Sequence, residues 1–98
     1  MLKACTLIKR KPGMAVDAFQ GYWLGTHSDI VKKLPFVKQY VQSHPLLGGY
    51  RKKDLIYDGL AEIWVDDTEA LRELAYTEAY QAVREDEGKF IDARGTAL

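Results

Sequence analysis

Residues 19–44 read FQGYWLGTHSDIVKKLPFVKQYVQSH, and this stretch decides the fold. It contains both histidines of the chain, one of the two tryptophans and two of the three phenylalanines. Apolar residues recur first at the period of a helix and then, beyond Pro35, at the period of a strand. The stretch therefore predicts a helix, a basic turn and a strand. It also holds most of the side chains that could carry out chemistry.

The first half of this stretch has the pattern of an amphipathic helix. Phe19, Trp23 and His27 are spaced i, i+4 and i+8, so they share one face. Gly21 and Gly25 are unusual inside a helix, where each costs about 1 kcal/mol relative to alanine. Two explanations remain open at this point. Either the glycines let another backbone or a ligand approach closely, or they mark an irregular segment.

The second half is predicted to be a strand over residues 36–44. One face of this strand carries Phe36, Lys38, Tyr40, Gln42 and His44. Tyr40 and His44 should therefore point the same way, with Gln42 between them. Strand alternation alone does not say whether this face meets the helices or a second copy of the chain.

Working outward, residues 2–9 and 57–65 are predicted to be two further strands, because apolar residues alternate along both. Asp66 and Glu69 have the spacing of a capping box at the start of a second helix. Thr77 is a candidate cap for a continuation of that helix, and Gly88 is expected to end it. Residues 89–92 begin a short last element, which gives the order β-α-β-β-α with a possible final strand.

This order predicts a single α+β domain over residues 1–98. Two split βαβ units form a ferredoxin-like sheet with both helices on one face. A domain of this length buries only roughly 60–65% of the surface that its unfolded chain exposes, so its core is thin. The same face of a second copy is the economical cover for the bare side of the sheet. We therefore expect a homodimeric α+β barrel with a short or incomplete last strand.

The composition is that of a globular protein and excludes several classes. Fourteen basic and fourteen acidic residues give a net charge of zero, which argues against a nucleic-acid partner. Lys9-Arg10-Lys11 is interpreted as a run of solvated loop charges. No run approaches the ~18 apolar residues of a membrane helix. The chain has one cysteine, Cys5, and no signal-peptide pattern, so a cytoplasmic location without membrane association is expected. Cys5 itself is predicted to be a small buried apolar residue.

The runs KRKPGMAVDAFQGYWLGTHSDIVKKLP, KQYVQSHPL, YDGLAEIWVDD and GKFID, in this order and spacing, resemble the EthD family of small dimeric α+β barrels. The resemblance covers residues 9–92. It implies a ferredoxin-like fold and kinship with cofactor-free enzymes, among them methylmuconolactone isomerases and polyketide dehydratases or decarboxylases. In the isomerase, a helix histidine and a tyrosine on the next strand line the pocket, and these match His27 and Tyr40. The chain departs from the family where Ser28-Asp29 follows His27, and where it stops at ARGTAL.

Three residues are candidate catalytic groups. His27 has a side chain that can act as acid or base near neutral pH, although a buried histidine bonded to a backbone carbonyl is the alternative. Tyr40 and His44 could bind or protonate a carbonyl, or could simply form a half-buried strand end.

Five more residues are candidate substrate contacts. Gln42 lies between Tyr40 and His44, and Glu62 could orient a histidine, although a structural ion pair with a lysine or arginine is the favoured interpretation. The aromatic candidates for a pocket wall are Phe19, Trp23 and Trp64, and Phe36 could join the same wall. Core packing is the commoner use of such residues. No metal-ligand spacing, phosphate-binding glycine pattern or nucleophile motif is present, so neither a metal nor a cofactor is expected.

The resulting hypothesis is a protein that binds a small apolar, aromatic or lactone-like molecule. It would act as an isomerase, dehydratase or decarboxylase by proton transfer. The alternative is a non-catalytic binding or accessory protein that uses the same pocket.

Overall fold

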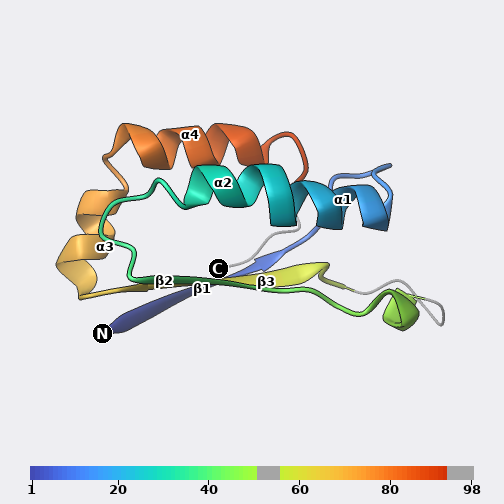
Figure 1. Cartoon of the computed structure of the whole chain (residues 1–98), viewed down its shortest axis with the longest axis horizontal. Helices are drawn as coiled ribbons and strands as arrows, with labels where there is room; N and C mark the ends of the chain where they lie inside the picture. Colours follow the sequence, from blue (N-terminus) through green and yellow to red (C-terminus); the bar gives the residue numbers. More distant parts are fainter. Residues whose placement is uncertain (51–55, 93–98) are drawn as a thin grey trace.

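The computed structural model describes residues 1–50 and 56–92 and has two layers (Figure 1). A three-stranded sheet forms one layer, and helices cover one of its faces. In chain order the elements are β1 (Leu2–Ile8), α1 (Val16–Tyr22), the π-helical segment η1 (Trp23–His27), α2 (Ser28–Val31), β2 (Gln39–Ser43), the 3₁₀ turn η2 (Leu47–Tyr50), β3 (Gly59–Val65), α3 (Thr68–Leu74) and α4 (Glu78–Glu87).

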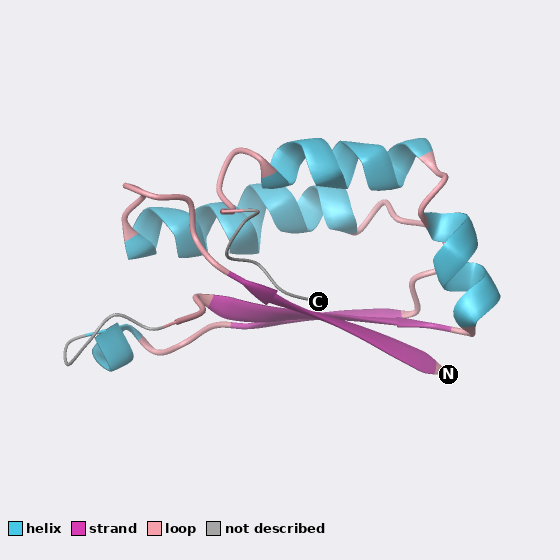
Figure 2. Cartoon of the chain, turned by 180° about the vertical axis from the view of Figure 1, so that it is seen from behind, coloured by secondary structure: helices cyan, strands magenta, loops and turns pink. Residues whose placement is uncertain are grey.

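The sheet is antiparallel, with strand order β1-β3-β2. This is the ferredoxin-like arrangement predicted from the sequence, in which the helices α1, α2 and α4 lie on one side (Figures 1 and 2). In place of a fourth strand, the described residues contain one isolated bridge between Arg10 and Ile91. The rest of the expected last strand, residues 93–98, lies outside the described part of the chain.

Strand pairing assigns each side chain to one of two faces. Leu2 pairs with Val65, Thr6 with Ala61, and Tyr40 with Ile63, and these residues share the inner face, toward the helices. The outer face, over which no described helix lies, carries Lys3, Cys5, Leu7, Gln39, Val41, Ser43, Leu60, Glu62 and Trp64. Cys5 is exposed on this face, so its prediction as a buried residue is wrong for the single chain.

The first helical region is continuous but not regular. Five residues, Trp23–His27, wind as a π-helix between α1 and α2. The irregular segment predicted as one of the two explanations is observed at Gly25. No other part of the described chain lies within 4 Å of a Cβ built at Gly21 or Gly25, so no approach of another backbone within this chain requires these glycines.

The second helical region begins at a cap one residue later than predicted. The side chain of Asp67, rather than Asp66, accepts a hydrogen bond from the amide of Ala70 at 2.8 Å. Thr77 caps α4 as predicted, because its Oγ1 accepts from the amide of Tyr80 at 3.1 Å. Gly88 ends α4, also as predicted. None of the described helices is long and apolar enough to cross a membrane.

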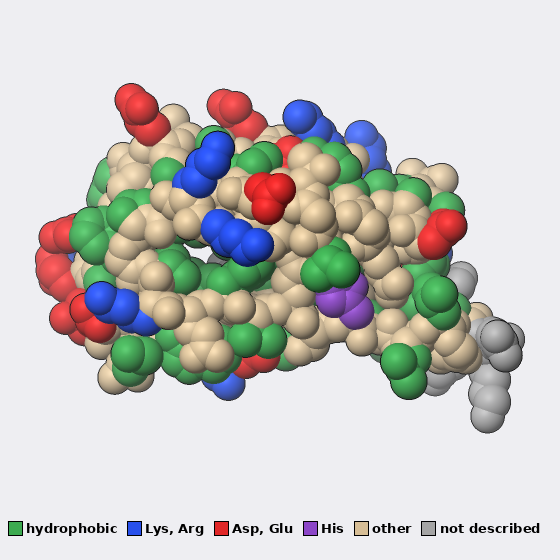
Figure 3. All heavy atoms as spheres, in the orientation of Figure 1, with side chains coloured by type: hydrophobic (Ala, Val, Ile, Leu, Met, Phe, Trp, Pro, Cys, Tyr) green, Lys and Arg blue, Asp and Glu red, His purple; other side chains and the backbone are tan. Residues whose placement is uncertain are grey.

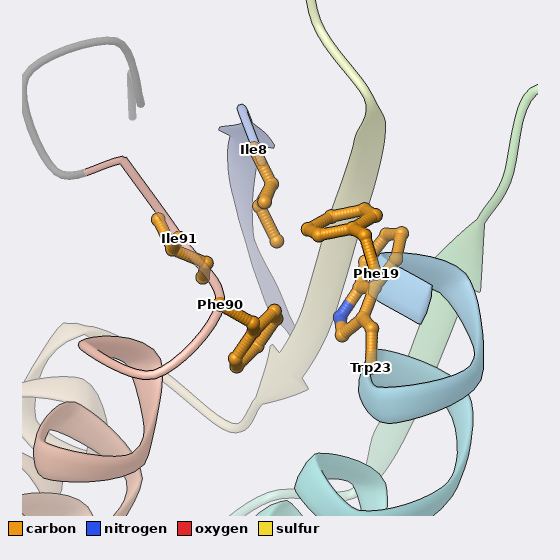
Figure 4. Close-up of a cluster of buried hydrophobic side chains, with 5 residues drawn as sticks. All are labelled: Ile8, Phe19, Trp23, Phe90 and Ile91. Atoms are coloured by element: carbon orange, nitrogen blue, oxygen red, sulfur yellow. The ribbon is translucent and has the colours of Figure 1, made fainter. Parts of the chain in front are cut away.

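The core lies between the helices and the inner face of the sheet (Figure 4). Its buried cluster consists of Ile8, Phe19, Trp23, Phe90 and Ile91. The Phe19 ring packs against the Trp23 ring at 5.6 Å and the Phe90 ring at 5.7 Å, so three elements meet there. Phe19 and Trp23 are completely buried, as the predicted apolar stripe requires.

The strand predicted over residues 36–44 begins later than expected. β2 covers only Gln39–Ser43. Phe36 has a φ of 68°, in the left-handed region that a bulky residue seldom adopts, and the extended chain cannot run through it. The shortened strand keeps the predicted alternation, so Tyr40 and Gln42 still share one face.

Candidate functional site

The helix face and the strand face singled out in the sequence lie opposite each other and run in opposite directions. At one end, the Trp23 and His44 rings are 4.3 Å apart. At the other end, Val31 and Tyr40 line the same cavity. His27 lies between Trp23 and Val31 along the helix, and its ring contacts Asp86 and Phe90.

The cavity opens between the helices and the sheet. Its volume is about 180 Å³, and its walls include Val31, Lys32, Leu34, Val37, Lys38 and Tyr40. Figure 3 shows an opening between the two layers, with apolar side chains inside it and basic side chains beside it. A cavity of about 150 Å³ is known to hold benzene, so this one has room for a single ring with a small substituent.

A hydrogen-bonded row follows the inner face of β2. The Gln42 amide donates from Nε2 to the Tyr40 hydroxyl at 2.6 Å and to the Trp23 carbonyl at 2.8 Å. Its Oε1 lies 2.8 Å from Nε2 of His44, which must then carry the proton and donate. Since the Tyr40 oxygen is an acceptor here, its own O–H is left to donate to a ligand.

Tyr40 and His44 are both uncharged at neutral pH. Burial raises the pKa of Tyr40, and this outweighs the hydrogen bond from Gln42 and the nearby Trp23 indole, which act in the opposite direction. Burial lowers the pKa of His44. Tyr40 is therefore suited to donate a hydrogen bond to a carbonyl, not to act as a base.

A second polar group surrounds His27 on the helix side. Nδ1 of His27 lies 2.8 Å from Oδ2 of Asp86, and the Tyr22 hydroxyl donates to Oδ1 of Asp86 at 2.6 Å. His27 and Asp86 are each only 4% exposed. The carboxylate requires a proton on Nδ1, so the lone pair of the imidazole is on Nε2, where a general base needs it.

The ionisation of this group follows from burial and hydrogen bonding. Burial lowers the pKa of His27, and this outweighs the contacts with Asp86 that would raise it. Burial alone would raise the pKa of Asp86, but the hydrogen bonds from Tyr22 and His27 prevail and lower it. The hydrogen bond to Asp86 raises the pKa of Tyr22 to about 12. At neutral pH the group is thus a neutral imidazole held by a carboxylate anion.

The indole N–H of Trp23 is a buried donor without an acceptor in the described part of the chain. It is close enough to the Tyr40 hydroxyl to affect the pKa of that group. An unsatisfied buried donor costs about 1–3 kcal/mol, and such groups call for a specific explanation. The Tyr40 oxygen is the nearest candidate acceptor, because the indole is close enough to lower the pKa of the phenol as a hydrogen-bond donor does.

The other predicted site residues lie elsewhere. Phe19 is in the core, away from the lined cavity. Glu62 and Trp64 are on the outer face, on the far side of the sheet from Tyr40. There the Lys3 ammonium lies 3.0 Å from Glu62 and 5.5 Å from the centre of the Trp64 ring. This geometry matches the favoured interpretation of Glu62 as a structural ion-pair partner.

Sequence reasoning did not single out Asp86, and a signal for it existed. Val83, Asp86 and Phe90 have spacings of three and four, which place an acidic residue on the buried face of α4. The last turn of a helix also disfavours a negative charge, so an acidic residue there needs another reason. Contact with His27 is that reason.

A separate buried group at the start of β3 was also missed. Asp58 is 1% exposed and accepts from the Arg10 amide at 2.8 Å, the Arg10 guanidinium at 2.7 Å and the Tyr50 hydroxyl at 2.7 Å. The interpretation of Lys9-Arg10-Lys11 as solvated charges is therefore wrong for Arg10. This group ties the end of β1 to the loop after β2 and takes no part in the cavity.

Comparison with known proteins identifies relatives of the whole domain. The model of the EthD domain family matches residues 11–94. An EthD family protein from Bacillus halodurans is 20% identical, with a TM-score of 0.73 over 94% of this chain and 93% of that chain. HapK from Hahella chejuensis is 14% identical, with a TM-score of 0.67 over 93% and 84%.

A protein of unknown function from Thermobifida fusca, described as dimeric and ferredoxin-like, is 15% identical, with a TM-score of 0.69 over 98% and 89%. A search of curated proteins found no match. At these identities, the structural similarities establish the fold.

Proposed function

Because this chain belongs to the EthD family, we propose that it binds a small, ring-sized molecule between its helices and its sheet and acts on it by proton transfer. The observation that carries this proposal is a cavity of about 180 Å³ lined by Val31 and Tyr40. These two residues continue, beyond the cavity lining, into the helix residues Trp23 and His27 and the strand residues Gln42 and His44. The helix face and the strand face place apolar walls, a phenol donor and an oriented imidazole in one region.

The proposed chemistry divides between two residues. Tyr40 donates its hydroxyl hydrogen to a ligand carbonyl and so favours the enol or enolate form. His27 takes a proton from the carbon beside that carbonyl through Nε2 and returns it at another carbon. Gln42 and Asp86 position these two groups, because each holds its neighbour by a hydrogen bond under 3 Å. This cycle needs no cofactor, and a migrating double bond is its simplest outcome.

A suitable test substrate is α-angelica lactone, a five-membered unsaturated lactone small enough for the cavity. The protein should speed its conversion to the conjugated isomer and incorporate deuterium from heavy water, as followed by NMR. His27→Asn should reduce the rate by about 10²–10⁴-fold, the usual contribution of a general base. The wild-type rate should fall as the pH drops below the imidazole pKa, which burial places under its ordinary value of 6.5.

Two controls make this result decisive. Thr26→Val, at an exposed position of the same π-helical segment, should keep the full rate. His27→Asn should remain folded by circular dichroism. Equal rates for the wild type and His27→Asn would remove His27 from the mechanism.

A non-catalytic carrier is the second candidate, and the burial of His27 favours it. With 4% of its surface exposed, this ring reaches a ligand only if the ligand enters deeply. A carrier would bind the lactone, as judged by shifts of the Tyr40 resonances, without exchanging its protons. Binding without exchange in the wild type would therefore favour this second function.

We also propose that two copies associate through their outer sheet faces. Leu7, Leu60 and Trp64 lie on this face, and Leu7 is 38% exposed. Leu46 and Leu47, in the loop after β2, are 84% and 57% exposed. A second copy that covers these residues would remove apolar surface from water. A cytoplasmic location belongs to the same proposal and is supported by the single free thiol.

A further inference from the structure

We propose that the ligand is a carboxylic acid whose carboxylate is held at the mouth of the cavity by Lys32 and Lys38, with its ring directed toward Tyr40. This inference rests on the proposed binding function and specifies its ligand class. It follows from the placement of charge around the cavity.

Two lysines line the cavity, one at the end of α2 and one just before β2. These are Lys32 and Lys38. Their side chains are 68% and 53% exposed, so they reach solvent at its rim. A carboxylate between them could accept from both ammonium groups.

The existing partners of these lysines hold them only loosely. Lys32 lies 3.9 Å from Asp29, and Lys38 lies 3.8 Å from Asp66. Exposed pairs at such distances contribute about 0–1 kcal/mol, and their side chains exchange partners readily. Both ammonium groups can therefore turn to a ligand at little cost in free energy.

The rest of the cavity determines which way an acid would lie. Val31, Leu34 and Val37 supply apolar walls that suit a ring. The two ammonium groups of the cavity lining belong to Lys32 and Lys38, so the carboxylate belongs at the lysine end. A hydroxyl or carbonyl on the far side of the ring suits the Tyr40 donor.

The test compares 4-hydroxybenzoate with 4-hydroxybenzamide, its neutral isostere, by titration at pH 7.5 and low salt with NMR detection. The wild type should bind the acid about tenfold more tightly than the amide, since two exposed ion pairs contribute an effect of that order. This preference should shrink at 0.5 M salt, because screening weakens exposed charges.

The double variant Lys32→Met/Lys38→Met should bind the two compounds equally, with an amide affinity like that of the wild type. Lys33→Met is the matched control, because Lys33 is an exposed neighbour of Lys32 that does not line the cavity. It should keep the tenfold preference.

The possible failures are distinguishable. Equal binding of acid and amide by the wild type would overturn the carboxylate inference while leaving the cavity as a binding site. An equal loss of preference in Lys33→Met would overturn the assignment to Lys32 and Lys38. If neither compound binds at millimolar concentration, both this inference and the proposed binding function are overturned.

Discussion

At the scale of the residue, the tightest packing in the core is at Gly59, where there is no room for a side chain. A Cβ at this position would collide with the six-membered ring of Trp23. Trp23 is fully buried and contacts both Phe19 and His44. Gly59 therefore determines how closely the helix approaches β3, and with it the position of the cavity.

The first prediction at this scale concerns Gly59→Ala. The added methyl group should destabilise the protein by about 1–3 kcal/mol, the usual cost of overpacking a core. Chemical denaturation measures this change. Gly21→Ala is the matched control, because nothing within the described chain obstructs a Cβ there and alanine favours a helix by about 0.5–1 kcal/mol. Equal stabilities for the two variants would contradict the tight contact.

Single residues also show where sequence reasoning ends. The position of Trp23 in the core followed from helical period alone, and Thr77 followed from its capping chemistry. The pairing of His27 with Asp86 did not, because 59 positions separate them and no local pattern joins such residues. The pairing of the half-buried Arg10 with the buried Asp58 was not predicted for the same reason.

At the scale of the element, the strand after the helix was the least predictable part. Alternation of side chains correctly placed Tyr40 and Gln42 on one face, but it did not tell that this face is the inner one. The start of β2 was misplaced by three residues, since Phe36 adopts a φ of 68° that alternation cannot reveal. Side-chain spacing reports the faces of an element well and its ends poorly.

The second prediction belongs to this element. Phe36→Gly should be more stable than Phe36→Ala by about 1–2 kcal/mol, because only the glycine relieves the left-handed backbone. The comparison between the two variants cancels the loss of the phenyl ring, which is 43% exposed. Thermal unfolding of both proteins gives the difference. Identical melting temperatures would show that the backbone at this position is unstrained.

At the scale of the whole molecule, the main feature is that helices cover only one face of the sheet. The helices protect the inner face, while Leu60, Glu62 and Trp64 of the central strand lie on the outer face. The order of the elements predicted this asymmetry, because two split βαβ units place both helices on one face of the sheet and leave none for the other.

The third prediction tests association through this face. Leu60→Lys should turn a dimer into a monomer in sedimentation at micromolar concentration, because it places a charge at the centre of the proposed interface. Leu24→Lys makes the same change on a helix, where Leu24 is 65% exposed, and should remain dimeric. A wild-type protein that is monomeric at this concentration would rule out the interface.

The π-helical segment Trp23–His27 limits which deletions the helix can accept. One extra residue in a helical turn rotates everything beyond it by about 100° relative to everything before it. A homologue lacking that residue could direct either Trp23 toward β3 or His27 toward Asp86, but not both. Substitutions in this turn should thus be tolerated more often than deletions. The number of residues in the turn is therefore a better marker than their identity for relatives that keep the same site.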